Sequence, residues 1–129
     1  MNKEFVDYKT ALALKELGFD FEDNDILGFY SIKHGVTSHQ QLTKNDGYNP
    51  AILYQQAFRW FREKYDLHGC IDLHCSTPIH WFIRIDKMDI NDYLYHSEDD
   101  NIQYSTYEEA ELACLKKLIE IVDGKLKLV

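Results

Sequence analysis

Apolar residues recur at intervals of three and four along three stretches of the chain, and this spacing predicts three α-helices. Each stretch also carries polar residues at its ends that are typical of helix starts and stops. The expected helices cover residues 7–18, 50–66 and 106–122.

The ends of these helices are predicted from residues with known capping roles. Asp7 is the expected N-cap of the first helix, and Gly18 suits the left-handed position that ends it. The pair Asn49–Pro50 has the residue types of an N-cap and a first helical position. Thr106 begins the third helix as part of a capping box, and Gly124 is the expected stop.

Stretches rich in aromatic and β-branched residues predict strands between the helices. A short turn at Ser76–Pro78 joins the two most regular of them, so we expect a hairpin there. The acidic connection over residues 86–101 is expected to be exposed and to carry one further short strand. The expected strands cover residues 26–33, 36–42, 70–75, 79–85 and 93–95.

The order of these elements predicts the fold class. The helices and strands are expected in the order α-β-β-α-β-β-(β)-α. This order favours an α+β fold in which an antiparallel sheet is covered by three helices. A chain of 129 residues has the length of one domain. We therefore expect a single compact α+β domain over residues 1–129.

The strand pattern also predicts which side chains form the core. Side chains alternate along a strand, so Trp81, Ile83 and Ile85 share one face. The second helix carries a matching apolar stripe, and we expect these three residues to be buried against it. On the preceding strand, Ile71 and Leu73 are expected to be buried as well.

The charge and the apolar stretches of the chain indicate which partners and which location to expect. A formal net charge of −8 repels phosphate backbones, so nucleic acid is not an expected partner. No stretch approaches the roughly 18 apolar residues of a membrane span, and the N-terminus lacks the apolar centre of a signal peptide. These features predict a cytoplasmic protein without a membrane partner, in which Cys70, Cys75 and Cys114 are free thiols.

Four potential metal ligands, His68, Cys70, Asp72 and His74, alternate along one predicted strand and should share a face. His80 on the next strand could approach them across the hairpin. Same-face neighbours lie roughly 6.5–7 Å apart, so the four cannot converge on one ion. At most two could bind with help from elsewhere. The sequence therefore favours a solvated face without metal or cofactor, and His68, Cys70, His74 and His80 are the candidates if a metal binds.

Cysteine–histidine catalysis is a further hypothesis, since Cys75 lies near His80 in the sequence and Cys70 near His68. A nucleophilic cysteine needs a base within reach and an electropositive setting, and no basic cluster supports either pair. The sequence also lacks a glycine-rich phosphate loop, a G-x-S-x-G elbow and an H-E-x-x-H stretch. It therefore favours a protein without catalytic residues.

Three stretches together resemble a known family. They read EFVDYKTALALKELGFD, LYQQAFRWFREKYDLHG and YSTYEEAELACLKKLIEIV. They are similar to short proteins that are encoded in phages and prophages of intestinal anaerobic bacteria, a family without an established activity. The resemblance covers roughly half of the chain and implies an origin on a mobile element and a cytoplasmic host.

A second resemblance concerns the order of elements. A helix, an antiparallel sheet and a last helix reading EEAELACLKKLIEIV are similar to a double-stranded RNA-binding domain. That family uses basic residues at the start of its last helix to hold phosphates. Here the helix starts with Tyr107, Glu108 and Glu109, so the resemblance implies the order of elements and not the RNA contact.

The last helix predicts self-association. Its apolar residues cover roughly 260° of the helix circumference, which is more than one sheet can bury. Leu112, Leu115 and Ile119 are left over, and a twofold partner is the commonest cover for such a patch. We therefore expect a homodimer through this helix. The competing explanation is that helix 7–18 or the tail Lys125–Val129 covers the same flank.

Three functions follow from these patterns. The sequence favours a non-catalytic accessory protein of a phage or prophage that acts through protein–protein contact with a host or phage protein. The alternative is a small metal-binding protein or enzyme that uses the strand residues between positions 68 and 80. A third possibility, suggested by the net charge of −8, is an acidic protein that competes for a host nucleic-acid-binding factor.

Overall fold

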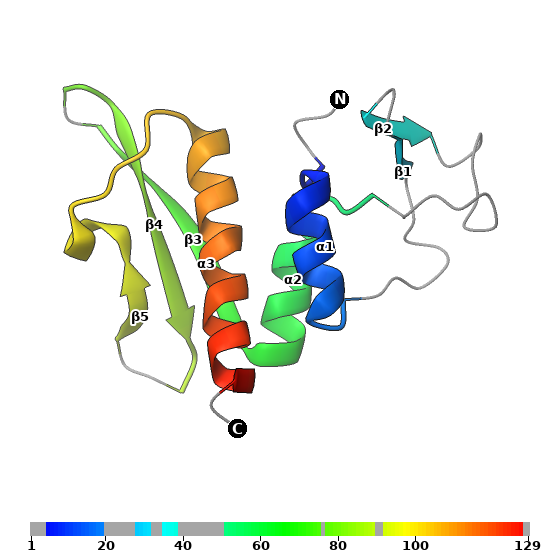
Figure 1. Cartoon of the computed structure of the whole chain (residues 1–129). Coiled ribbons are helices and arrows are strands. Elements are labelled where there is room, and N and C mark those ends of the chain that lie inside the picture. Colours follow the sequence, from blue (N-terminus) through cyan, green and yellow to red (C-terminus); the bar gives the residue numbers. More distant parts are fainter. Residues whose placement is uncertain are drawn as a thin grey trace. The chain divides into compact units, whose positions relative to one another are not determined.

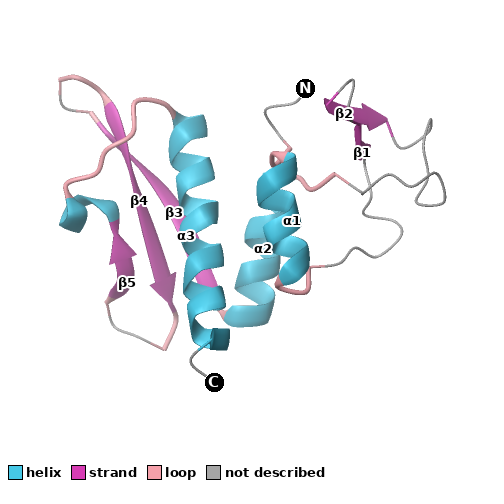
Figure 2. Ribbon diagram, viewed as in Figure 1, coloured by secondary structure: helices cyan, strands magenta, loops and turns pink. Residues whose placement is uncertain are grey.

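The computed structural model describes residues 5–19, 28–31, 35–38, 51–75, 77–89 and 92–127. Contacts group the chain into two compact units, residues 1–57 and 58–129, and each is described by itself. The elements follow one another as helix, two strands, helix, three strands and helix (Figures 1 and 2). The predicted α+β class with antiparallel strands is therefore confirmed, whereas a single domain stays a prediction.

Helix α1 (Tyr8–Glu16) has both predicted caps. The Asp7 carboxylate accepts hydrogen bonds from the Thr10 backbone N–H at 3.2 Å and from the Thr10 hydroxyl at 2.7 Å. Gly18 has a φ of 104°, the left-handed conformation that a residue with a side chain rarely adopts. The Phe19 N–H then donates to the Leu14 carbonyl, which closes the helix end in the manner of a Schellman motif.

The first unit also contains two short antiparallel strands, β1 (Gly28–Ser31) and β2 (Gly35–Ser38). Tyr30 pairs with Val36, and Ser31 pairs with Gly35. β1 lies inside the predicted range 26–33, and β2 begins one residue before the predicted range 36–42. The predicted helix start Asn49–Pro50 lies outside the described residues.

Helix α2 (Tyr54–Tyr65) begins four residues later than residue 50, the predicted start. The backbone before it is extended, because Leu53 bridges Phe5 and the Ile52 carbonyl accepts from the Val6 N–H at 2.7 Å. The Gln56 side chain accepts from the Leu53 N–H at 2.9 Å, which is one half of a capping box. The predicted start was wrong because a bridge to the N-terminal segment holds residues 52–53.

The second unit is built on a three-stranded antiparallel sheet in the order β3-β4-β5. The strands are β3 (Leu67–His74), β4 (His80–Lys87) and β5 (Tyr93–His96). A 3₁₀ turn, η4 (Ser97–Asp100), follows, and α3 (Tyr107–Lys127) ends the unit. The predicted hairpin of β3 and β4 and the short strand near residue 93 are both confirmed, whereas the predicted turn residue Ser76 lies outside the described residues.

One face of this sheet packs against α3. Leu67, Ile83 and Ile85 lie on that face and are fully buried or nearly so. The main cover of Ile83 and Ile85 is therefore α3, whereas the sequence analysis assigned it to the second helix. The prediction of burial is confirmed for Ile83 and Ile85 but not for Trp81, which is half-buried.

The turn end of the hairpin is less covered than the sequence analysis expected. Leu73 is 49% exposed although it lies on the face that packs against α3, and its cross-strand partner is Trp81. The Trp81 ring contacts the ring of Tyr107, the first residue of α3, at a centroid distance of 5.3 Å. Since α3 begins at this level of the sheet, it leaves Leu73 accessible, and the predicted burial of Leu73 was wrong.

Gly69 lies inside β3 and not, as expected, before the strand. A Cβ at this position would lie 2.9 Å from the Cys114 Sγ of α3 and 2.9 Å from Cε1 of Phe58 in α2. Real Cβ atoms do not approach other atoms so closely, so the missing side chain is what lets both helices meet the strand.

Two predictions about α3 were wrong. The helix continues through Gly124 to Lys127, so Gly124 is not its stop. Leu115, which was expected to be left exposed, has a relative exposure of 0%, and Leu112 and Ile119 are half-buried. The predicted start is confirmed, because the Thr106 hydroxyl accepts from the Glu109 N–H at 3.1 Å.

The outer side of β4 is hydrogen-bonded along its length. Beyond the part that pairs with β5, the Ile83 N–H donates to the buried Ser97 hydroxyl at 3.0 Å. Further along, Trp81 and Tyr104 exchange backbone hydrogen bonds of 2.8 and 2.9 Å. The segment after β5 therefore continues the hydrogen bonding of β4, while residues 98–101 of the connection are exposed, as predicted.

Replacing Ser97 by Ala should destabilise the second unit by about 1–3 kcal/mol, because the buried Ile83 N–H would lose its acceptor. Urea unfolding followed by circular dichroism measures this loss. Ser105→Ala is the matched control, since Ser105 is exposed and should change stability by less than about 0.5 kcal/mol. Equal stability of the two variants would contradict the role given to Ser97.

Among the described residues, no helix has the length and apolar character that crossing a membrane requires.

Candidate functional site

The candidate site is the sheet face opposite α3, called the open face here. Cross-strand pairing defines it, because residues paired across an antiparallel ladder point to the same side. Each side chain on it is at least partly accessible to solvent. The pairs that form it are His68 with Asp86, Cys70 with Arg84, Asp72 with Phe82, and His74 with His80.

The candidate ligands His68, Cys70, Asp72 and His74 lie on one face, as predicted, and His80 approaches His74 across the hairpin. The His74 and His80 rings stack at a centroid distance of 4.8 Å. The described residues contain no cluster of three or more histidine, cysteine or acidic side chains suited to hold a metal ion.

A row of imidazole and aromatic rings crosses the open face from β3 to β5. Phe82 lies at its centre, with ring centroids 4.9 Å from His80, 5.6 Å from His74 and 5.8 Å from His96. Tyr93 extends the row, 5.4 Å from His96. Phe82, His96 and Tyr93 were not predicted as site residues, because their grouping depends on how β5 pairs with β4. Alternation alone could have added Phe82.

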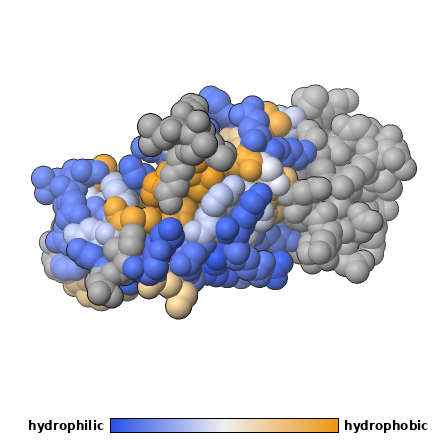
Figure 3. All heavy atoms as spheres, turned by 90° about the horizontal axis from the view of Figure 1, so that it is seen from below, coloured by the Kyte–Doolittle hydropathy of each residue, from blue (hydrophilic) through white to orange (hydrophobic). Residues whose placement is uncertain are grey.

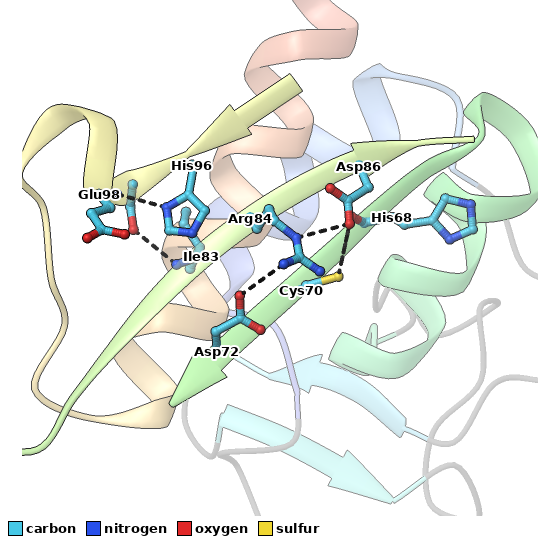
Figure 4. Close-up of polar contacts among 9 residues, drawn as sticks. His68, Cys70, Asp72, Ile83, Arg84, Asp86, His96 and Glu98 are labelled. Carbon is cyan, nitrogen blue, oxygen red and sulfur yellow. Dashed lines mark hydrogen bonds and ion pairs between the residues drawn. The ribbon is translucent and has the colours of Figure 1, made fainter. Parts of the chain in front are cut away.

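Beside this ring row lies a charged network centred on Arg84 (Figure 4). The Arg84 guanidinium contacts the Asp86 carboxylate at 3.1 Å and the Asp72 carboxylate at 3.6 Å. The Asp86 carboxylate, together with Asp72, raises the pKa of Arg84. Two carboxylates against one guanidinium give this part of the face a net negative charge. Ion pairs that are this exposed to solvent add little to the stability of the fold.

Hydrogen bonds determine which ring nitrogens carry protons in three of the histidines. The His80 Nδ1 lies 2.9 Å from the Pro78 carbonyl, which can only accept, so Nδ1 donates. The His96 Nδ1 accepts from the Glu98 N–H at 3.1 Å, as Figure 4 shows, so its Nε2 carries the proton in the neutral ring. The His68 Nε2 lies 3.0 Å from the Asp66 carboxylate and donates to it. The neutral His80 ring therefore presents a lone pair at Nε2, and the His96 ring does not.

The environment of Cys70 opposes nucleophilic catalysis. Burial and the nearby Asp86 carboxylate raise the pKa of the Cys70 thiol, and its Sγ lies 3.8 Å from that carboxylate. A reactive cysteine needs the opposite setting, in which positive charge favours the thiolate. The cysteine–histidine hypothesis therefore gains no support at Cys70.

All three cysteines are free thiols, as predicted, but they differ in burial. Cys75 is exposed, Cys70 is intermediate and Cys114 is buried, and burial raises the pKa of Cys114 to about 12. Because the pKa of Cys114 is raised, this thiol stabilises the folded state at pH values below 9.0, the ordinary thiol pKa. The contribution is lost as the pH rises from 9.0 towards about 12.

Alkylation with iodoacetamide at pH 8 should therefore modify Cys75 first, Cys70 more slowly, and Cys114 only after unfolding. Mass spectrometry of the digested protein gives the order. Rapid modification of Cys114 in the folded protein would contradict its burial.

Comparison with known proteins returned no significant match to a protein-family model, to a curated protein or to a solved structure.

Apolar side chains remain accessible around this face. Ile79 in the hairpin turn is 63% exposed, and Tyr93 and Leu94 in β5 are 38% and 39% exposed. On the side of the molecule drawn in Figure 3, hydrophilic residues cover most of the described surface and hydrophobic residues show in patches between them.

Proposed function

We propose that the protein is a non-catalytic binding protein that acts through protein–protein contact, with the open face as its contact surface. The observation that carries this proposal is the ring row of His74, His80, Phe82, His96 and Tyr93, which lies across three strands on the sheet face opposite α3. Aromatic residues and arginine are enriched in protein interfaces, with polar residues at the rim. The resemblance to short phage and prophage proteins supports the role of an accessory protein.

The charges around the ring row favour a partner with a basic segment. Glu98, Asp99 and Asp100 of η4 follow β5 and are exposed, and Asp72 and Asp86 both contact Arg84. An arginine or lysine of the partner would find carboxylates at the rim and the faces of Phe82 and Tyr93 for cation–π contact. The overall charge of −8 adds to this preference.

Capture experiments with two matched variants test the proposal. Phe82→Ala removes the centre of the ring row, and Leu12→Ala removes a side chain of α1 that is 40% exposed. We expect wild type and Leu12→Ala to retain the same host or phage protein, and Phe82→Ala to bind it at least about 30-fold more weakly, as for an interface hot spot. Circular dichroism confirms that the variants are folded.

Salt and competition separate the alternatives. Binding to a basic segment should weaken when the ionic strength is raised, because screening shortens the reach of charges. If the captured protein binds nucleic acid and is released by added nucleic acid, the acidic-competitor function replaces the one proposed. If Phe82→Ala binds the captured protein as tightly as wild type does, the open face is not the contact surface.

A homodimer through α3 stays a prediction, and Leu112 is a suitable position at which to test it. Leu115→Glu would place a charge at a fully buried position and unfold the chain, whereas Leu112 is half-buried. We expect sedimentation equilibrium to give a mass of two chains for wild type and of one chain for Leu112→Glu. A wild-type mass of one chain would contradict the predicted homodimer.

A further inference from the structure

His96 accepts a hydrogen bond that only a neutral imidazole can accept. It is the N-cap of η4, and its Nδ1 accepts from the Glu98 N–H at 3.1 Å. The hydrogen bond of His80 in the same ring row has the opposite direction, because its Nδ1 donates to the Pro78 carbonyl. A protonated imidazole carries a proton on both nitrogens, so it can donate but cannot accept. Protonation therefore leaves the bond of His80 in place and removes the bond of His96.

The groups around His96 that carry or can gain a charge come from four elements. Arg84 is the cross-strand partner of His96, and two carboxylates contact its guanidinium. Tyr93 lies 5.4 Å from the His96 ring, and its hydroxyl donates to the Asp99 carboxylate at 3.1 Å. Negative charge therefore exceeds positive charge around this imidazole. The groups are Asp72 on β3, His80, Arg84 and Asp86 on β4, Tyr93 on β5, and Glu98, Asp99 and Asp100 on η4.

The rest of η4 is held by bonds that do not involve the His96 side chain. The Ile102 N–H donates to the Ser97 carbonyl at 2.9 Å, which closes the far end of the turn. The buried Ser97 hydroxyl accepts from the Ile83 N–H at 3.0 Å and ties the turn to β4. Loss of the His96 bond therefore changes the start of η4, where the acidic residues lie, and leaves the sheet in place.

We propose that His96 is a pH-sensitive switch of the open face, an inference that rests on the proposed contact with a basic segment. Histidine is the side chain that changes its charge between about pH 5 and 8. Neutral His96 caps η4, whose carboxylates attract the basic segment. Protonated His96 releases the Glu98 N–H and places a positive charge next to Phe82 and Tyr93, the rings offered to the partner's cation. The face therefore binds a basic segment more weakly as the pH falls through this range.

NMR of the isotopically labelled full chain between about pH 5.5 and 8 tests the switch without a partner. We expect the His96 ring signals and the Glu98 amide signal to titrate with the same midpoint, because one proton breaks the bond between them. His96→Asn keeps a side-chain acceptor but does not titrate, so its Glu98 signal should stay constant. His80→Asn is the matched control and should keep the Glu98 transition. A Glu98 signal that does not follow the His96 ring in wild type, or that moves equally in His96→Asn, would overturn the switch.

Binding of a fluorescent octa-arginine peptide, measured by anisotropy at constant ionic strength, tests the consequence for the open face. We expect wild type to bind this probe about two- to fivefold more weakly at about pH 5.5 than at about pH 7.5, the size of effect that one exposed charge pair gives. Each variant is judged by its own ratio of the two dissociation constants. The ratio for His96→Asn should be less than half of the wild-type ratio or close to one.

Phe82→Ala distinguishes failure of the switch from failure of the proposed contact. If Phe82→Ala binds the peptide as tightly as wild type at the higher pH, the peptide does not use the open face, and the contact and its regulation both fail. If Phe82→Ala binds more weakly but wild type and His96→Asn have the same ratio, the open face stays the contact surface and the switch is overturned.

Discussion

Replacing Ile83 by Ala should lower the free energy of unfolding by about 2–5 kcal/mol. Ile83 lies on β4, in the middle of the three-stranded sheet, and only 1% of it is exposed. Truncation would remove three methyl or methylene groups from the layer between β4 and α3 and leave a cavity that neighbouring side chains only partly fill. Urea unfolding measures the loss.

The control for this prediction is Ile79→Ala, which makes the same chemical change at a position that is 63% exposed. It should change stability by less than about 0.5 kcal/mol. If both variants lose the same free energy, Ile83 does not belong to the layer under α3, and the assignment of the two sheet faces is inverted.

Adding one methyl group at Gly69 should destabilise the second unit by about 1–3 kcal/mol or more. The new Cβ would lie 2.9 Å from the Cys114 Sγ and 2.9 Å from a ring carbon of Phe58, so the strand and at least one helix must move apart. Thermal and urea unfolding of Gly69→Ala measure the effect.

Gly124→Ala is the matched control, because a Cβ there would meet nothing within 4 Å. Gly124 lies inside α3, where alanine is favoured over glycine by about 0.5–1 kcal/mol, so this variant should be more stable than wild type. A double variant of Gly69→Ala with Cys114→Ala should lose less stability than the sum of the single variants. Additive losses would contradict a steric clash between positions 69 and 114.

Local features of the fold could be predicted from the sequence. The Asp7 cap, the left-handed Gly18 and the Thr106 cap depend on hydrogen bonds within three or four residues, which residue type largely decides. The hairpin and the shared face of His68, Cys70, Asp72 and His74 follow from alternation along one strand.

Features that depend on distant partners could not be predicted. The start of α2 is set by the bridge from Leu53 to Phe5, and periodicity carries no sign of that pairing. Leu115 has the pattern of a surplus apolar residue, yet its burial is decided by what packs on α3. The ring row needs His96 beside Arg84 and Phe82, a register that becomes known only once β5 is paired.

The hydrogen bonds along the outer side of β4 also bear on the solubility of the chain. Backbone groups left open at the edge of a sheet can recruit a strand from another molecule, and sheets that grow in this way lead to aggregates. Here Ser97 and Tyr104 already occupy the groups of Ile83 and Trp81, and β5 itself is only four residues long. The 3₁₀ turn that follows β5 interrupts this edge with three consecutive acidic residues. This side of the sheet therefore offers a second chain very little backbone to extend.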